Sequence, residues 1–214
     1  MVSGLWASDR GSMTDQQAPT PAGMEHVTGW AFLTAPVWLL LAWVVMWPLD
    51  GRSGPGAWWT LAHLSWIVGF GALGLVCLEL GRRTRTQSLG TQRLAGVFTA
   101  VTLLGLTAST VQMLVDLVAG FQTSDYDAMQ ARSDELTSYP GMDFVLYTLG
   151  PPLVFLGLFA LFVVLAARRL TNPLNPVLVL LALLVIGGFE ELSPLGLALF
   201  AMALVPIGWR LTRA

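Results

Sequence analysis

Four polar side chains inside apolar segments of this sequence could together do chemistry. His63 lies about six residues into one apolar segment, and Asp116 lies about five residues before the end of the next one. If consecutive apolar segments are antiparallel helices, both side chains lie roughly 7–9 Å from the same end of the helix pair. Gln112 lies one helical turn deeper than Asp116, and Tyr147 lies near the start of a later segment. We therefore predict a polar binding pocket formed by His63, Gln112, Asp116 and Tyr147.

Two roles for this pocket follow from its chemistry, and the sequence leaves both open. A histidine–aspartate pair could bind a proton, a cation or the polar head group of a ligand. Alternatively, His63 and Asp116 form a hydrogen bond between helices that fixes their packing, which is typically worth about 0.6–2 kcal/mol in a membrane. Glu190 and Glu191 end a later apolar segment and are expected to form the outer rim of the pocket.

Patterns typical of enzymes and metal sites are missing from the sequence. It contains no G-x-S-x-G, H-E-x-x-H, Walker or dinucleotide-binding motif. The single cysteine, Cys77, excludes a disulfide within the chain and a cysteine-based metal site. Glu190 and Glu191 lack the Glu-x-x-His spacing of a di-metal bundle, and one histidine in the apolar segments excludes bis-histidine haem ligation. We therefore predict no catalytic residue, no metal and no cofactor.

The composition is that of a membrane protein. Hydrophobic residues make up 55% of the 214 residues, charged residues make up only 11%, and the mean hydropathy is +0.67. A soluble domain carries about a quarter charged residues. The formal net charge of −2 argues against nucleic acid as a partner, because nucleic acid requires a basic patch. The lipid bilayer is therefore the expected partner.

Six apolar segments are expected to cross a membrane as helices, because one crossing needs about 20 apolar residues. The predicted fold class is all-α, a compact bundle of six transmembrane helices in one domain, residues 30–210. Residues 1–29 are polar, lack the pattern of a signal peptide and are predicted to be a disordered cytoplasmic tail. Residues 122–143 form an acidic outer loop. The predicted helices are 30–49, 57–80, 94–121, 144–167, 176–191 and 194–210.

The positions of the arginines predict the orientation in the membrane. Cytoplasmic segments are enriched in basic residues, and the sequence has arginine but no lysine. Nine of the 11 arginines fall on one side of the six-helix arrangement, so both termini are predicted to be cytoplasmic. The uninterrupted apolar part of the fifth helix spans only roughly 21 Å. A re-entrant hairpin of helices five and six is the alternative, and it leaves the termini on the same side. The nine are Arg10, Arg82, Arg83, Arg85, Arg93, Arg168, Arg169, Arg210 and Arg213.

The apolar segment 94–121 has two unlike faces at helical spacing. One face carries small and polar residues, and the other carries mainly aliphatic residues. In a bilayer the first face is expected to contact other helices and the second to contact lipid. The small and polar face consists of Thr102, Gly105, Ser109, Gln112 and Asp116.

Three local motifs predict where helices begin or bend. Ser124 is followed three residues later by an aspartate, which is the spacing of a capping box and predicts a short surface helix over 125–136. The Pro151–Pro152 pair predicts a bend or an irregular turn in the fourth membrane helix. Asn175 is expected to cap the fifth helix, with a proline at its first position.

Three stretches carry a resemblance to known proteins: AHLSWIVGFGALGLVCLELGRR, STVQMLVDLVAGF and LYTLGPPLVFLGLFALFVVLAARRL. With their histidine, aspartate and Gly-Pro placements, they resemble integral membrane proteins of GC-rich Gram-positive bacteria that have about six spans and no established activity. The resemblance covers roughly residues 30–210. It implies a membrane location and no particular reaction.

The sequence favours a non-enzymatic integral membrane protein of the cell membrane, such as an accessory or assembly component. Its partner beyond the bilayer would be another membrane protein or a second copy of the chain. One alternative is a small transporter or ligand-binding protein that uses the outer polar pocket. Another is a membrane enzyme that acts on a lipid-like substrate through His63 and Asp116.

Overall fold

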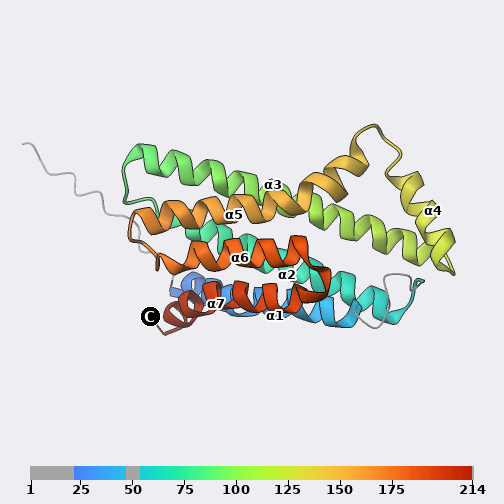
Figure 1. Cartoon of the computed structure of the whole chain (residues 1–214), viewed down its shortest axis with the longest axis horizontal. Helices are drawn as coiled ribbons and strands as arrows, with labels where there is room; N and C mark the ends of the chain where they lie inside the picture. The colour runs from blue at the N-terminus through green and yellow to red at the C-terminus, as the bar shows by residue number, and fades with distance from the viewer. Residues whose placement is uncertain (1–21, 47–53, 214) are drawn as a thin grey trace, which may run out of the picture.

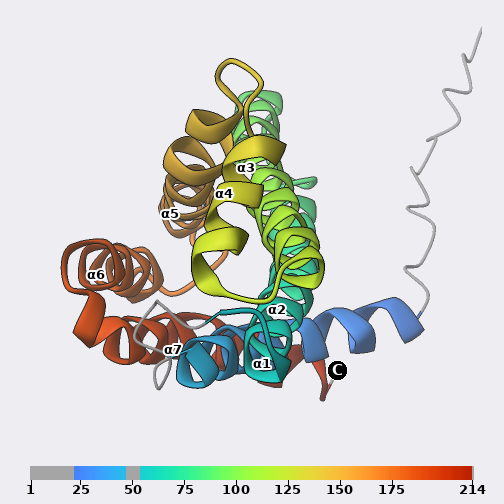
Figure 2. The same ribbon diagram turned by 90° about the vertical axis from the view of Figure 1, so that its right-hand side faces the viewer.

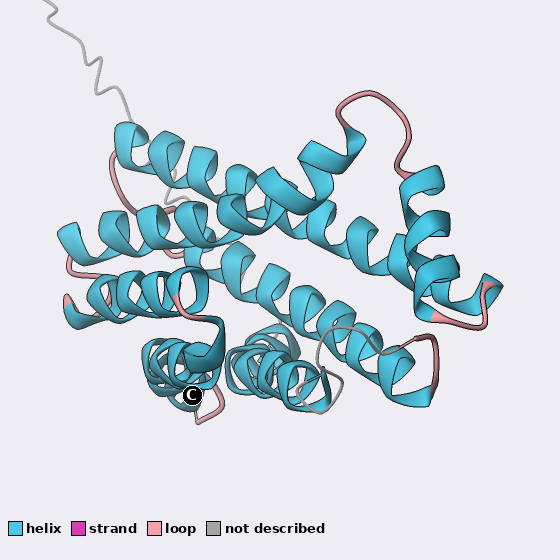
Figure 3. Cartoon of the chain, turned by 45° about the vertical axis from the view of Figure 1, so that its right-hand side comes forward, coloured by secondary structure: helices cyan, strands magenta, loops and turns pink. Residues whose placement is uncertain are grey.

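The computed structural model describes residues 22–46 and 54–213, and every regular element in these ranges is a helix (Figures 1 and 3). The fold class is therefore all-α, as predicted. In chain order the elements are α1 (Ala22–Met46), α2 (Ala57–Arg82), α3 (Leu89–Gln122), α4 (Tyr126–Leu136), the π-helical turn η2 (Phe144–Leu149), α5 (Gly150–Ala167), α6 (Leu174–Gly188), the 3-10 turn η3 (Glu190–Leu192) and α7 (Ser193–Leu211).

Five of these helices are long and apolar enough to cross a membrane: α1, α2, α3, α7 and the continuous helix formed by η2 and α5. The sixth apolar helix, α6, has 15 residues, which corresponds to roughly 22 Å, against a hydrocarbon core of about 30 Å. Large aliphatic side chains on the outside of the bundle are exposed, such as Leu104 (66%) and Val37 (61%). Such a surface is stable in lipid and unfavourable in water.

The six apolar helices form a ring. In the order α5, α3, α2, α1, α7, α6, each packs against the next, and α6 returns to α5. Figure 2 shows this ring from one end, with α4 lying across that end beside α3. The start of α1 and the end of α7 meet at the opposite end, where Gly29 packs against Thr212.

The small and polar face of α3 contacts other helices, as predicted. Thr102 and Ser109 are buried, and Gly105 lies so close to α5 that a Cβ atom there would come within 2.6 Å of the backbone nitrogen of Val154. Leu104, on the opposite face, is exposed. A methyl group at Gly105 would therefore separate the two helices that carry most of the predicted pocket.

Two predicted helix starts are wrong by several residues. α1 begins at Ala22, so part of the predicted tail is helical, and Thr28 and Gly29 are buried against the end of α7. Residues 1–21 and the predicted end of this helix at residue 49 lie outside the described residues. α3 begins at Leu89, five residues earlier than predicted, because Gln92 donates its side-chain amide to two carbonyl oxygens of the preceding turn.

Two of the predicted caps are also wrong, although the helices exist. Asp125, and not Ser124, caps α4, because its carboxylate accepts the backbone N–H of Ala128 at 2.9 Å. Asn175 lies within α6, where its side-chain amide donates to Thr171 (2.7 Å), and Asn172 accepts the backbone N–H of Leu174 at the start of the helix. A short polar side chain one to three positions away can cap the helix equally well, so spacing alone does not identify the capping residue.

The irregular turn expected at the proline pair is present. Residues 144–149 form the π-helical turn η2, and the regular helix α5 begins at Gly150 with prolines in its first turn. A proline lacks the N–H that the preceding turn would need, so the hydrogen-bond register changes there. This turn sets the direction in which Tyr147 projects.

Candidate binding site

Asp116 on α3 lies at the centre of a group of polar side chains from four elements. The Tyr147 hydroxyl on η2 donates to Asp116 Oδ1 at 2.6 Å, and the Ser133 hydroxyl on α4 lies 3.4 Å from the same oxygen. Ser133 and Tyr147 lie 3.1 Å apart. His63 Nε2, on α2, lies 3.8 Å from Asp116 Oδ2. We call these four side chains the outer cluster.

The contact between His63 and Asp116 is longer than a hydrogen bond. The Nδ1 atom of His63 lies 2.8 Å from the carbonyl oxygen of Trp59 and must donate its proton there, because a carbonyl can only accept. In a neutral imidazole, Nε2 then carries a lone pair that faces the carboxylate. A neutral His63 therefore donates no hydrogen bond to Asp116, and Oδ2 is open to another donor.

A cavity of about 240 Å³ opens beside Asp116. Its described lining contains one charged group, the Asp116 carboxylate, and three aromatic rings, those of Trp59, Tyr126 and Tyr147. The Asp116 side chain is 14% exposed and His63 only 5%, so the carboxylate, and not the imidazole, faces the cavity. The remaining lining residues are Met46, Met129, Gln130 and Ser133.

Trp59 is the cavity-lining residue that packs against His63. Its ring lies 4.0 Å from the His63 ring, centroid to centroid, and its buried indole N–H has no hydrogen-bond partner in the described structure. The close approach of Gly120 holds the indole in place, since a Cβ atom there would lie 3.0 Å from Trp59 Nε1. The indole ring of Trp59 therefore lines the cavity, while its N–H is buried beside Gly120.

Gln112, the fourth predicted pocket residue, lies in a different cavity. This central cavity of about 230 Å³ is lined by residues from all six helices of the ring, mainly by apolar and aromatic side chains. Its polar lining groups are Gln112 and Ser109, and the buried hydroxyl of Ser109 has no hydrogen-bond partner among the described residues. The apolar and aromatic lining residues are Leu39, Trp43, Trp66, Phe70, Leu73, Met113, Pro151, Val154, Phe155, Ile186 and Leu197.

Of the predicted outer rim, Glu191 does not line the cavity at Asp116. Glu191 is exposed in the turn between α6 and α7, and the side chain of Glu190 lies outside the described residues. In Figure 1 this turn ends short of the outer ends of α2 and α3. The shortness of α6 is the physical reason, because it keeps the α6–α7 turn away from the end of the bundle where α4 lies.

Three residues of the site come from features that the sequence analysis did not connect with it. Ser133 and Tyr126 come from α4, which was predicted only as a surface helix, and Trp59 was assigned no role in the pocket. Arg132 on α4 donates to Gln122 at the end of α3 (2.6 Å), which holds the short helix over the cavity. The signal in the sequence is the serine seven residues after Tyr126, which places both side chains on the same face of a helix.

The described residues contain no group of three or more His, Cys, Asp or Glu side chains that could hold a metal ion. The outer cluster offers one carboxylate, one imidazole and two hydroxyls, a donor set that suits a proton, an ammonium group or a polar head group. Comparisons of the chain with models of protein families, with curated proteins and with solved structures gave no match.

Proposed function

We propose that the protein is a non-enzymatic, ligand-binding membrane protein that holds a small organic cation, such as an ammonium group, in the cavity beside Asp116. The observation that carries this proposal is the lining of the cavity, where one carboxylate and three aromatic rings meet with no basic residue among the described ones. A cavity of about 150 Å³ is already large enough to bind benzene, so a cavity of about 240 Å³ has room for a small ammonium compound.

The state of Asp116 supports a cationic ligand. A carboxylate in a membrane-spanning helix is costly and requires a partner of opposite charge or strong donors. Tyr147 and Ser133 donate to Oδ1, while among the described residues Oδ2 has only the 3.8 Å contact to His63. A ligand cation would supply the missing favourable contact to Oδ2.

The aromatic rings support the same class of ligand. A cation over the face of Trp or Tyr gains about 0.5–2 kcal/mol, more when water is excluded. Trp59 and Tyr126 are both half-buried and line the cavity together with Tyr147. An accessory or assembly role would need only packing faces, and it would not account for a carboxylate directed into an aromatic cavity.

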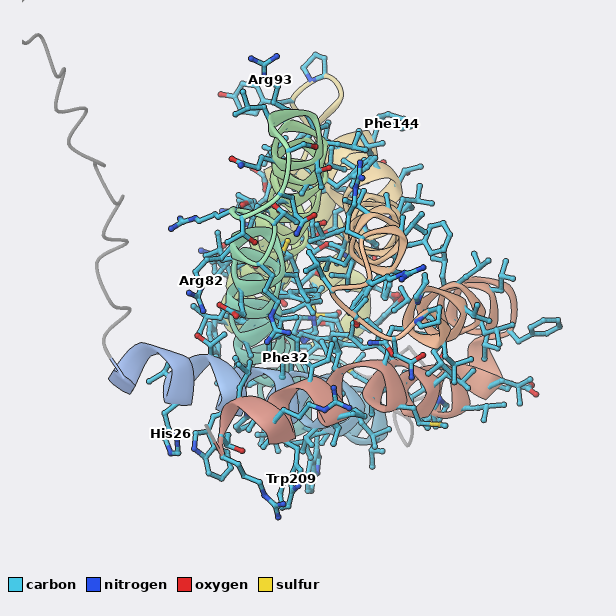
Figure 4. The ribbon with its side chains drawn as sticks, turned by 90° about the vertical axis from the view of Figure 1, so that its left-hand side faces the viewer. His26, Phe32, Arg82, Arg93, Phe144 and Trp209 are labelled. Atoms are coloured by element: carbon cyan, nitrogen blue, oxygen red, sulfur yellow. The ribbon has the colours of Figure 1, made fainter. Side chains whose placement is uncertain are left out.

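We further propose that the chain crosses the cell membrane of a bacterium six times, with both termini in the cytoplasm. Support for an even number comes from α6, which packs antiparallel on α7 and brings the end of α7 back to the start of α1 (Figure 1). Support for the orientation comes from the described arginines, since eight of these nine, all but Arg132, lie in segments at that end. Figure 4 views this end, where Arg82 and Arg93 project outward.

Titration of the purified protein with tetramethylammonium tests the function, with tryptophan fluorescence as the readout because Trp59 lines the cavity. Tetramethylammonium should bind saturably, and Asp116→Asn should weaken binding by about tenfold or more, since the variant removes a charge at close range. Uncharged tert-butanol, of similar size, should not bind.

Asp134→Asn is the matched control. It removes an equal charge from α4, at an exposed position outside the cavity lining. Equal weakening by both variants would mean a general effect of charge, and the proposal would be wrong.

A further inference from the structure

A second cavity lies at the opposite end of the bundle and has the opposite charge. Its volume is about 360 Å³, and Arg83, Arg169 and Arg210 line it. These arginines come from three separate segments: the end of α2, the turn between α5 and α6, and the last turn of α7. No acidic residue is among its described lining residues. The cavity is therefore suited to an anion.

The positive charge of this cavity is only partly neutralised. Glu79 accepts from Arg83 at 3.2 Å and also from Arg82 at 2.6 Å, so one carboxylate serves two guanidinium groups. Arg169 and Arg210 make no ion pair with a described residue. Guanidinium groups that share a cavity without acidic partners are a typical setting for phosphate recognition.

The backbone at Arg169 adds an independent observation. Its φ angle is +58°, and the N–H groups of Arg169 and Leu170 donate to Ala166 and Leu165. These bonds define a Schellman motif, in which glycine usually occupies the left-handed position. An arginine there is strained, and strained residues cluster at functional sites.

The apolar wall of the cavity indicates what kind of phosphate compound fits. Leu174 on α6 and Met202 on α7 line the cavity and are also 52% and 58% exposed on the outer surface of the bundle. Acyl chains could run along this surface while the head group contacts the arginines. A free phosphate ion would leave the apolar wall unused.

We propose that this cavity binds the phosphate group of an anionic phospholipid from the leaflet at the arginine-rich end of the protein. Basic pockets between membrane helices are known to hold such head groups, at about one charge-assisted contact per arginine. The site would fix this end of the ring to the membrane surface, because the cavity takes residues from the end of α2, from α6 and from α7.

Native mass spectrometry of the full-length protein with equal amounts of phosphatidylglycerol and phosphatidylcholine tests the proposal. The wild type should prefer phosphatidylglycerol by at least tenfold. Arg169→Gln and Arg210→Gln should each reduce this preference by about fivefold. Arg168→Gln removes the same charge from a neighbouring exposed position outside the cavity, and it should change the preference less than twofold.

Arg169→Gly distinguishes a loss of lipid binding from a loss of stability. Glycine suits the left-handed position, so this variant should unfold at an equal or higher temperature and still lose the preference. Equal effects of the Arg168, Arg169 and Arg210 variants would overturn the proposal, because attraction would then depend on overall charge. Binding of inorganic phosphate alone, with no lipid preference, would also overturn it in favour of a free-anion site.

Discussion

The outer cavity and the central cavity have nearly the same volume, about 240 and 230 Å³, yet their chemistry differs completely. Both take polar residues from the same face of α3, where Ser109, Gln112 and Asp116 follow one another at helical spacing. At Asp116, hydroxyls from α4 and η2 complete a hydrogen-bonded group. At Ser109 the surrounding lining is mainly apolar, and the hydroxyl has no hydrogen-bond partner among the described residues. Whether a polar residue of α3 belongs to a hydrogen-bonded site therefore depends on the elements that pack against α3 at that position.

The largest stability effect is expected from Tyr147→Phe. The variant removes the donor to Asp116 Oδ1 and keeps the ring, so the free energy of unfolding should fall by about 1–2 kcal/mol. Tyr139→Phe is the control. Tyr139 is 76% exposed, so this substitution should leave the free energy of unfolding unchanged. Unfolding in mixed micelles measures both variants. If the two behave alike, the outer cluster does not stabilise the fold.

Ser133→Ala should lower the stability of the protein, whereas Ser109→Ala should not. Ser133 is hydrogen-bonded in the outer cluster, so its loss should cost about 1 kcal/mol. Ser109 carries a buried hydroxyl without a partner, so its removal should leave the stability unchanged or raise it by about 1 kcal/mol. The same unfolding assay compares the two. A loss at Ser109 as large as the loss at Ser133 would show that Ser109 has a partner, such as bound water.

The smallest effect is expected from Gln112→Leu on cation binding. Gln112 lines the central cavity and takes no part in the outer cluster, so the affinity for tetramethylammonium should change by less than twofold. Fluorescence titration against wild type measures this. A loss comparable to that of Asp116→Asn would restore the single pocket predicted from the sequence.

The sequence predicts the helices well because apolar length and helical spacing are local properties. The same reasoning predicts that His63 and Asp116 lie at equal depth, and the structure places their side chains 3.8 Å apart. Tyr147 could be assigned to the outer end of its helix, although its bond to Asp116 depends on the π-helical turn before the prolines.

Three features could not be predicted, because they depend on how elements are oriented in space. Gln112 shares a face with Asp116, but one helical turn moves it from the outer cluster into the ring of apolar side chains. Ser133 comes from a surface helix whose position follows from a contact between Arg132 and Gln122. Glu191 lies away from the site because α6 is short. Spacing along one helix does not contain this information.

The most direct test of the central claim is a crystal structure with a bromine-labelled ammonium compound, in which anomalous scattering locates the ligand. We predict one bromine peak in the outer cavity, with the ammonium group beside the Asp116 carboxylate and within about 6 Å of a Trp59, Tyr126 or Tyr147 ring centroid. An empty outer cavity at saturating ligand, or a peak in the central cavity beside Ser109 and Gln112, would contradict the account.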